Sequence, residues 1–371
     1  MPLTSYEQRY AELLCDYCLE LRRGDRLFVA TTTLAVPLVR ELHRAVLERG
    51  GHLETDLAWD GRARDFLRLA DDAQLARIPT RQREAFEEFE CYLAIRAPHN
   101  LRELADAPAD RQALRAEATR ELNRTYFRRT GTRELRRSLC QYPTQAAAQQ
   151  AGMSLDAYRV FVFGACKLDA PDPRAAWLDL RRRQQAVTDR LNGAREVRYV
   201  NARSDLRFSV AGRTWINSDG QTNMPSGEVY TSPVEDSAVG HIHFDYPAVH
   251  KGHEVRGVTL WVEDGEVVRW DAEQGRDYLD TVFALPGARR FGEAAVGTNY
   301  GIDRFTGNIL FDEKIGGTVH LAIGQSYRQC GGRNESSVHW DMIAGMREGG
   351  EIHLDGELVY RDGAFLDYEL A

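Results

Sequence analysis

The sequence has no stretch that approaches the ~20 consecutive apolar residues of a membrane-spanning helix. Its N-terminal segment is charged and amphipathic, so it lacks the basic start and apolar core of a secretory signal. Basic residues do not predominate either, because 56 acidic and 48 basic side chains give a net charge of -8. We therefore expect a cytoplasmic protein that binds neither membranes nor nucleic acid.

Cysteine is scarce. Six cysteines stand at irregular positions in 371 residues, which favours reduced thiols over a disulfide framework. Cys15 and Cys18 form a CxxC pair, but the apolar residues around them recur with helical spacing and no second CxxC is present. This pattern favours buried thiols on a helix face over a redox or zinc motif.

The glycines form no nucleotide-binding motif. Neither GxGxxG nor GxxxxGK[ST] follows a predicted strand, which argues against a dinucleotide or triphosphate site. What is present is an ordinary globular composition, with 43% hydrophobic and 28% charged residues. A chain of 371 residues is long enough to form two domains, each with its own core.

Residues 1–192 predict alternating helices and strands. Helical patterns cover 5–22 and 35–49, and a short apolar run of strand type lies between them at 26–30. Another predicted strand, at 91–95, is bracketed by charged helical patterns. This alternation predicts an N-terminal three-layer α/β domain around a mostly parallel sheet.

The pattern changes to short strands and turns after residue 192. A charged helical stretch at 173–191 ends at Asn192-Gly193, and we place the domain boundary there. Later hairpins are predicted at Asp264-Gly265 and Asp355-Gly356. We expect residues 193–371 to form a mainly β (α+β) C-terminal domain.

Seven of the ten histidines lie beyond residue 240, so the search for metal chemistry begins there. If residues 338–342 form a strand, His339 and Asp341 project from one face, and apolar side chains project from the other. His320 stands between the small residues Thr318 and Ala322 in a similar alternating run. Two imidazoles and a carboxylate suit an open site for zinc, iron, cobalt or manganese.

Several carboxylates occupy glycine-rich, non-helical segments of the same half. They are Glu228 in NMPSGEVYT, Glu293 in FGEAAVGTN, and Asp312-Glu313 in LFDEKIGG. No spacing rule selects these residues from the 56 acidic side chains of the chain.

A second histidine cluster competes with the first. His241, His243 and Asp245 alternate in the segment HIHFD, and His250 and His253 follow closely. Spacing alone does not separate the two clusters, and the alternative to a metal site on HIHFD is a solvated face of an edge strand.

Four ordered segments carry a family resemblance. They are NMPSGEVYTSP at 223–233, FGEAAVGTN at 291–299, GNILFDEKIGGTVHLAIGQSY at 307–327 and GGRNESSVHWDMI at 331–343. These segments resemble the thermophilic-type metalloaminopeptidases, the aminopeptidase T and aminopeptidase S (PepS) family. The likeness is strong from about residue 200 to 345 and weaker over the N-terminal half.

The resemblance implies two divalent metal ions per chain, either zinc, cobalt, manganese or magnesium. It implies that five residues hold them: Glu228, Glu293, His320, His339 and Asp341. It also implies peptide substrates with a free N-terminus, a C-terminal domain that bears the site, and a homodimer. Only eleven residues separate Tyr327 from His339, so we do not transfer the family's substrate preference.

The resemblance also places Tyr327 close to the reacting carbonyl. Its hydroxyl would then donate a hydrogen bond to the tetrahedral oxyanion. Glu228 or Glu313 would carry the proton, and a metal or a carboxylate such as Asp312 would recognise the substrate's α-amine.

Two other functions remain open at this point. One is a mononuclear iron ring-cleaving dioxygenase that uses His320, His339 and Asp341 as ligands, because dioxygenases of dihydroxypyridines resemble this family distantly. The other is a catalytically silent metal- or peptide-binding homologue. Counting the metals and assaying aminoacyl amides would distinguish the three.

Overall fold

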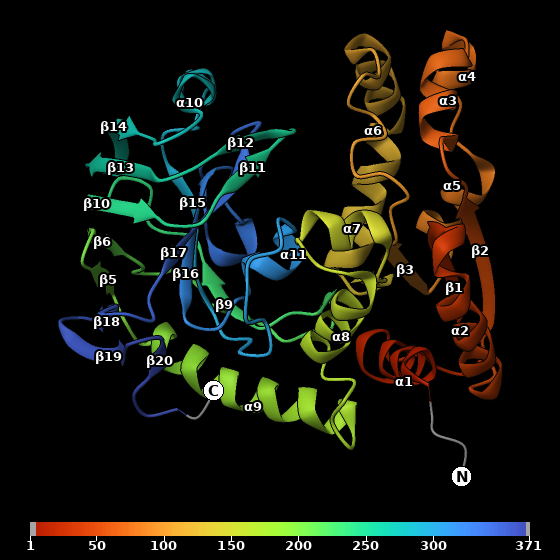
Figure 1. Cartoon of the computed structure of the whole chain (residues 1–371), viewed down its shortest axis with the longest axis horizontal. Coiled ribbons are helices and arrows are strands. Elements are labelled where there is room, and N and C mark those ends of the chain that lie inside the picture. The colour runs from red at the N-terminus through yellow and green to blue at the C-terminus, as the bar shows by residue number, and fades with distance from the viewer. Residues whose placement is uncertain (1–4, 369–371) are drawn as a thin grey trace. The chain divides into compact units, whose positions relative to one another are not determined.

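The computed structural model describes residues 5–368, and the chain divides into two compact units (Figure 1). Unit 1 comprises the chain through Arg174 together with residues 220–225, and unit 2 comprises residues 175–219 and the chain from Ser226 onward. This division differs from the expected boundary after residue 192.

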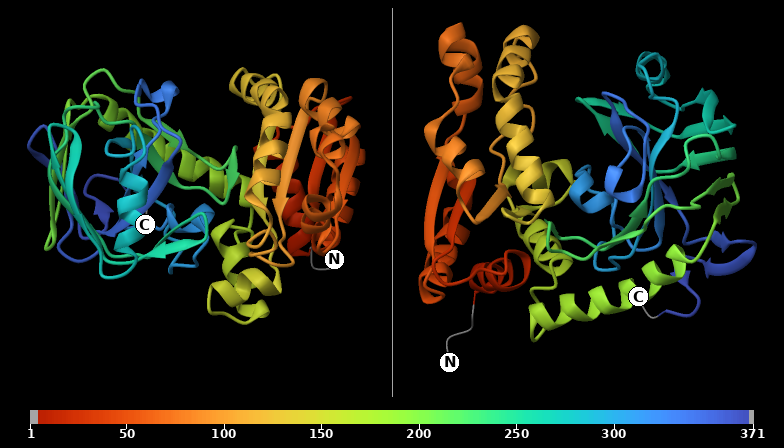
Figure 2. Two further views of the ribbon diagram at one scale, coloured as in Figure 1. Left: turned by 90° about the horizontal axis from the view of Figure 1, so that it is seen from above. Right: turned by 180° about the vertical axis from the view of Figure 1, so that it is seen from behind.

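The difference arises from helix α9 (Pro173–Asn192), the helix predicted over 173–191. Most of it groups with unit 2, and Figure 2 shows it running beside the strands of that unit. Gln184, which is fully buried on α9, donates to the backbone oxygens of Ser218 at 3.1 Å and Glu228 at 2.7 Å. These contacts bind the helix to the second unit.

Unit 1 contains a five-stranded sheet, sheet A, in the order β2-β1-β3-β4-β8, with every neighbouring pair parallel. Its strands are β1 (Arg26–Thr32), β2 (His52–Ala58), β3 (Cys91–Arg96), β4 (Arg136–Gln141) and β8 (Asn223–Met224). Because parallel neighbours require crossover connections, helices separate most of these strands. The helices are α1 (Tyr6–Leu13), α2 (Val36–Glu48), α3 (Arg62–Leu69), α4 (Asp72–Ala76), α5 (Thr80–Glu87), α6 (Ala109–Gly131), α7 (Gln145–Gln150) and α8 (Leu155–Ala165).

Helices cover both faces of sheet A. Phe28 of β1 packs in a cluster with Phe86 of α5 and Leu122 of α6. Its chain neighbours Leu27 and Val29 point to the opposite face and are also fully buried. Helix α2 contacts β1 and β2, and α1 packs on α2. The predicted three-layer α/β architecture is confirmed.

The first predicted helix is shorter than expected. It begins after Ser5, whose side chain accepts from the amide of Gln8, and it passes into a π-helical turn over Leu14–Cys18. Glu20 then has a φ of 46°, which ends the helical path before residue 22. Cys15 and Cys18 are buried in the π-helical turn, and all six cysteines are buried and outside any disulfide among residues 5–368, as predicted.

Unit 2 is mainly antiparallel β structure, as predicted. Sheet B has the order β14-β13-β10-β6-β5-β18-β19-β20. Its strands are β5 (Glu196–Asn201), β6 (Ser204–Ser209), β10 (Val239–Phe244), β13 (Val258–Glu263), β14 (Glu266–Asp271), β18 (Glu351–Leu354), β19 (Glu357–Arg361) and β20 (Ala364–Phe365). The β13–β14 turn has positive φ at both Asp264 and Gly265, and the β18–β19 turn has the same at Asp355 and Gly356. Both predicted hairpins are confirmed.

Sheet C carries the candidate residues and has the order β17-β16-β15-β9-β7. Its strands are β7 (Ile216–Ser218), β9 (Glu228–Thr231), β15 (Phe291–Gly297), β16 (Thr318–Gly324) and β17 (His339–Gly345). Unit 2 also contains a short hairpin and two helices, namely β11 (Ala248–His250), β12 (His253–Val255), α10 (Arg276–Phe283) and α11 (Ile309–Asp312). In Figure 1 the strands of sheet C lie between those of sheet B and helix α11.

Over residues 5–368, no helix combines the length and the apolar character needed to cross a lipid bilayer.

Candidate metal centre

Four adjacent strands of sheet C bring the candidate ligands to one face. The five residues are Glu228 on β9, Glu293 on β15, His320 on β16, and His339 and Asp341 on β17. Residues that pair directly across antiparallel strands share a face, and Ala322 of β16 pairs with Glu293 on one side and Asp341 on the other. His320 precedes Ala322 by two positions, so it projects from the same face.

Small residues leave room on this face. Ala295 pairs with His320, Gly297 pairs with Glu228, and Gly324 pairs with His339. The opposite face is apolar, because Val319, Leu321, Ile323, Trp340 and Met342 are all buried. The alternation predicted for residues 318–323 and 338–342 is therefore present.

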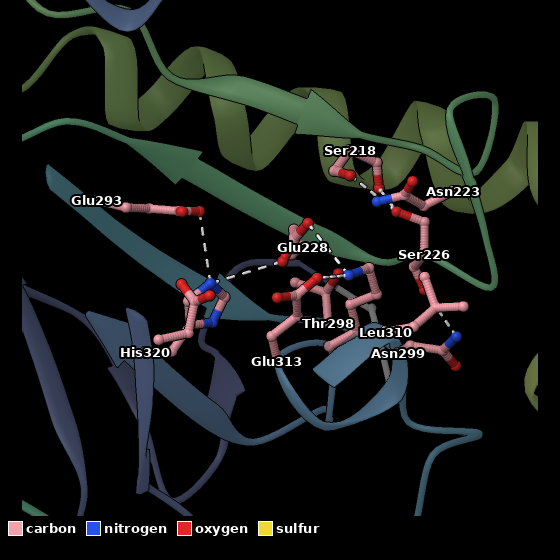
Figure 3. A network of polar contacts seen from close by, with 12 residues as sticks. Ser218, Asn223, Ser226, Glu228, Glu293, Thr298, Asn299, Leu310, Glu313 and His320 are labelled. Carbon is pink, nitrogen blue, oxygen red and sulfur yellow. Dashed lines mark hydrogen bonds and ion pairs between the residues drawn. The ribbon is translucent and has the colours of Figure 1, made fainter. Parts of the chain in front are cut away.

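The carboxylate of Glu293 lies between two imidazoles. Its Oε1 is 3.5 Å from His320 Nε2, and its Oε2 is 3.2 Å from His339 Nε2. Glu228 Oε2 lies 3.6 Å from His320 Nε2, and Figure 3 shows Glu228 and Glu293 both directed toward that ring. Asp341 Oδ1 lies 3.6 Å from His339 Nε2. Glu293 thus joins a Glu228–His320 group to a His339–Asp341 group.

The centre is buried, and several of its ligand-type atoms have no hydrogen-bond partner. Glu228, Glu293 and His320 are 6%, 5% and 1% exposed. Among the described residues, no partner satisfies Glu228 Oε2, Asp341 Oδ1 or either ring nitrogen of His320. Unsatisfied buried polar atoms are costly, and in this case they belong to side chains of metal-binding types.

This donor set fits divalent cations. Imidazole nitrogen together with carboxylate oxygen suits zinc, manganese or cobalt. Glu293, His339 and Asp341 each offer a ligand atom within 4.8 Å of the others. A second set, formed by Glu228, His320 and the other oxygen of Glu293, lies beside it.

The ring of His339 is held by a backbone contact. Its Nδ1 lies 2.8 Å from the carbonyl oxygen of Gln325, an acceptor to which Nδ1–H donates. This hydrogen bond leaves Nε2 of the neutral ring as the nitrogen that faces the centre.

Tyr327 also reaches the centre. Its hydroxyl is 3.2 Å from Nε2 of His339. Its backbone amide donates to Ser232 Oγ at 3.1 Å, and its ring packs edge-on against Tyr230 at a centroid distance of 5.4 Å. The side chain is therefore held at the edge of the ligand cluster.

The local charges shift the ionisation of the centre strongly. Burial alone would raise the pKa of Glu293, but the two neighbouring imidazoles lower it to about 2. Burial alone would lower the pKa of both histidines, yet the Glu293 carboxylate raises the pKa of His320 to about 9 and that of His339 to about 10. Burial raises the pKa of Glu228 to about 7 and that of Asp341 to about 6. Protons on the imidazoles thus supply the positive charge of the metal-free centre.

Two further residues support the centre. Lys314 is completely buried, its Nζ lies 3.6 Å from Glu228 Oε1, and it forms a hydrogen bond with Glu313. Gln184 donates to the backbone of Glu228 and accepts from Thr298 Oγ1 at 2.8 Å. Neither Lys314 nor Gln184 is identified from the sequence as part of the centre, because no local pattern marks a lysine beside Glu313 or a glutamine on a distant helix.

Asp312 does not face the centre as a free carboxylate. It is 1% exposed and accepts from the backbone amide of Thr306 at 2.7 Å and from its hydroxyl at 2.8 Å. Its contacts stabilise the loop that leads into α11, and no contact supports its use as an acceptor for a substrate amine.

The HIHFD cluster is not assembled as a metal site. His243 Nδ1 contacts Thr259 Oγ1 at 2.8 Å, and its Nε2 lies 3.8 Å from Asp245. His250 contacts the hydroxyl of Tyr278 at 2.7 Å and stacks on Trp340. In the described part of the chain, the three ligand-type side chains whose ligand atoms all lie within 4.8 Å of one another are Glu293, His339 and Asp341, and this group includes no residue of HIHFD.

Comparison with known proteins agrees with the fold. The thermophilic metalloprotease (M29) family model matches residues 4–365. The chain is 27% identical to aminopeptidase 2 of Geobacillus stearothermophilus, over 96% of this chain and 94% of that protein. It is 28% identical to aminopeptidase T of Thermus aquaticus, over 94% of each.

Two solved structures share the fold. Wild-type AmpT from Thermus thermophilus superposes with a TM-score of 0.83 at 22% identity, covering 97% of this chain and 99% of that one. The 2,5-dihydroxypyridine dioxygenase from Pseudomonas putida KT2440 superposes with a TM-score of 0.60 at 15% identity, covering 98% and 99%.

A buried set of imidazoles and carboxylates on an antiparallel sheet, within a chain matched almost throughout by one protease family model, defines a metal-dependent peptide hydrolase. The chain belongs to the thermophilic metalloprotease (M29) family. The family resemblance seen in the sequence is confirmed.

Proposed function

We propose that this protein is an aminopeptidase that removes N-terminal amino acids from peptides and uses two divalent cations. The relatives named aminopeptidase support the exopeptidase activity. The observation that carries the two-cation proposal is the position of Glu293, whose two oxygens face two different imidazoles. We propose that Glu293 would serve both cations, that Glu228 and His320 would help hold one, and that His339 and Asp341 would help hold the other.

Divalent cations bound there would lower the pKa of a water molecule to near neutrality and stabilise negative charge on the substrate oxygen. The protein's own residues would then orient the substrate and move the protons. The hydroxyl of Tyr327 contacts His339 Nε2 in the metal-free centre, and it becomes free to donate to the substrate's oxyanion once that nitrogen acts as a ligand.

Glu228 is our candidate for the group that accepts the water proton and passes it to the leaving amine. Its carboxylate lies within the centre, with Oε2 3.6 Å from His320 Nε2. Glu313, the alternative, is hydrogen-bonded to Lys314.

The dioxygenase alternative is less well supported. It requires only His320, His339 and Asp341 as ligands, and it leaves Glu228 and Glu293, which lie 3.6 and 3.5 Å from His320 Nε2, without a role. Likeness to the dioxygenase structure at 15% identity concerns the fold only.

The test is a panel of aminoacyl amides and peptides assayed on metal-stripped protein, with zinc, cobalt, manganese or magnesium added back singly. We expect release of the N-terminal residue only from substrates with a free amine, and saturation of activity near two ions per chain. N-acetylated versions of the same peptides serve as controls. Equal cleavage of the acetylated peptides would contradict the exopeptidase proposal, and a single iron with oxygen consumption would favour the dioxygenase.

We further propose a cytoplasmic homodimer. The sequence resemblance supports the dimer, and six buried cysteines without a disulfide among residues 5–368 support a reducing compartment. Light scattering coupled to gel filtration tests the proposed dimer, since a monomer of 42.0 kDa would contradict it.

A further inference from the structure

Lys314 is an unusual residue for this chain. Of the 48 basic residues only three are lysines, at positions 167, 251 and 314, and the remainder are arginines. Lys251 is exposed and Lys167 is partly exposed, but Lys314 has no exposed surface. An ammonium group without access to water requires anionic partners. Lys314 has them in Glu313, to which it is hydrogen-bonded, and in Glu228, whose Oε1 lies 3.6 Å away.

The backbone delivers this ammonium to a fixed place. The amide of Lys314 donates to the carbonyl of Phe311 at 3.0 Å, and its own carbonyl accepts from the amide of Asn299 at 3.0 Å. Thr298, next to Asn299, donates from its amide to the carbonyl of Gly227 at 2.8 Å. The segment that carries Lys314 is thereby tied to the residues that follow β15 and precede β9.

The two oxygens of Glu228 consequently have different surroundings. Oε1 faces the ammonium of Lys314, whereas Oε2 lies 3.6 Å from His320 Nε2 and accepts no hydrogen bond within residues 5–368. Figure 3 shows Glu228 between His320 on one side and Glu313 on the other. A carboxylate oriented in this way offers a single oxygen to the centre.

We infer that Lys314 is a positioning residue for the metal pair, holding Glu228 so that only Oε2 is presented to the cation that shares His320. The inference rests on the proposed function, because it concerns one of the two proposed coordination spheres. Outer partners that orient metal ligands commonly contribute ~10- to 100-fold to metal affinity or activity.

A lysine suits this position better than an arginine. Its compact ammonium has three donors on a flexible stem, so it serves two carboxylates at once in a space with no exposed surface. The guanidinium group is larger and planar, and it would have to displace Glu228 or Glu313. We therefore expect Lys314→Arg not to restore what Lys314→Met loses.

The main experiment measures binding of zinc or manganese to metal-stripped Lys314→Met, with Lys251→Met as the matched control. We expect the control to bind two equivalents like the wild type, and Lys314→Met to bind one of them ~10- to 100-fold more weakly. At limiting metal, kcat should fall while KM changes little, because Lys314 is too buried to contact the substrate. Two equivalents bound with wild-type affinity would overturn the role of Lys314.

The variant Glu313→Gln tests whether Lys314 positions Glu228 or only compensates the charge of Glu313. If Lys314 acted through its charge alone, Lys314→Met would strengthen cation binding and Glu313→Gln would weaken it, because the two variants remove opposite charges. We expect Glu313→Gln to retain both metal equivalents, because the ammonium still holds Glu228. An equal loss in both variants would contradict the inference.

A measurement on the wild-type protein avoids reliance on folding of the variant. Labelling with lysine enriched in ¹³C at Cε should give three signals, and Lys167→Met and Lys251→Met assign two of them by subtraction. We expect the Lys314 signal to move on metal addition while the other two stay in place; an unmoved signal overturns the inference. If the wild-type chain binds fewer than two cations, the proposed function is contradicted. If the wild type and Lys314→Met both bind two cations with the same affinity, only the role of Lys314 is contradicted.

Discussion

Glu293 Oε2 lies 3.2 Å from His339 Nε2, although the two residues stand on strands separated by β16. The contact is possible because Ala322 and Gly324, their cross-strand partners on β16, have little or no side chain. Small residues on the central strand thus allow ligands on both flanking strands to meet above it.

This relationship predicts that Glu293 matters to both cations. Glu293→Gln removes the charge of the proposed bridge, so we expect weaker binding of both metal equivalents. We expect Glu293→Gln to lose about 4 kcal/mol of transition-state stabilisation, which lowers turnover roughly a thousandfold. Glu228→Gln is the matched control and should weaken one equivalent only. Metal analysis after dialysis distinguishes the two, and loss of a single ion from both variants would contradict bridging by Glu293.

Tyr327→Phe should lower turnover and leave the metal content intact. The hydroxyl lies at the edge of the centre, 3.2 Å from His339 Nε2, and removal of one oxyanion donor typically costs ~10² to 10³ in kcat. Tyr230→Phe changes the neighbouring ring in the same way without touching the ligands, and it should retain most activity. Unchanged turnover in Tyr327→Phe with full metal content would exclude the hydroxyl from the reaction.

Metal binding should release protons. In the metal-free centre the pKa values of His320 and His339 are raised to about 9 and about 10, mainly because the Glu293 carboxylate outweighs the effect of burial, so both rings are protonated at pH 8. A metal displaces those protons, so metal affinity should rise with pH up to about 10, and about two protons should leave per chain at pH 8. Calorimetric titration in buffers of different ionisation enthalpy measures this number. Binding heats that do not depend on the buffer would refute the prediction.

The apolar face of sheet C should determine stability. Leu321 is fully buried on β16, an interior strand of sheet C, on the face opposite the ligands. Leu321→Ala should lower the free energy of unfolding of the metal-free protein by about 2–5 kcal/mol, because it leaves a cavity. Leu366→Ala, at a side chain that is 51% exposed, should change it by less than about 0.5 kcal/mol. Urea unfolding measures both, and similar values for the two variants would contradict this view of the core.

Much of the local structure could be predicted from the sequence. The hairpin turns at Asp264 and Asp355 follow from Asp-Gly pairs that accept positive φ, and the helix at α9 follows from its periodicity. The two faces of β16 and β17 follow from alternation with a period of two. The boundary between the two units does not follow from a local pattern, because the contacts of Gln184 that attach α9 to unit 2 join residues distant in the chain.

The sequence by itself determined which side chains share a face of each strand, because side-chain direction in a strand depends only on neighbouring residues. It offered HIHFD and His339–Asp341 as equal candidates, and only the motif resemblance distinguished Glu228 and Glu293 from the other acidic residues. Tertiary structure alone decided that Glu293 meets two imidazoles, that Lys314 contacts Glu228, and that His243 and His250 contact Thr259 and Tyr278 instead. Those outcomes depend on strand order and register, which are set by packing between segments far apart in the sequence.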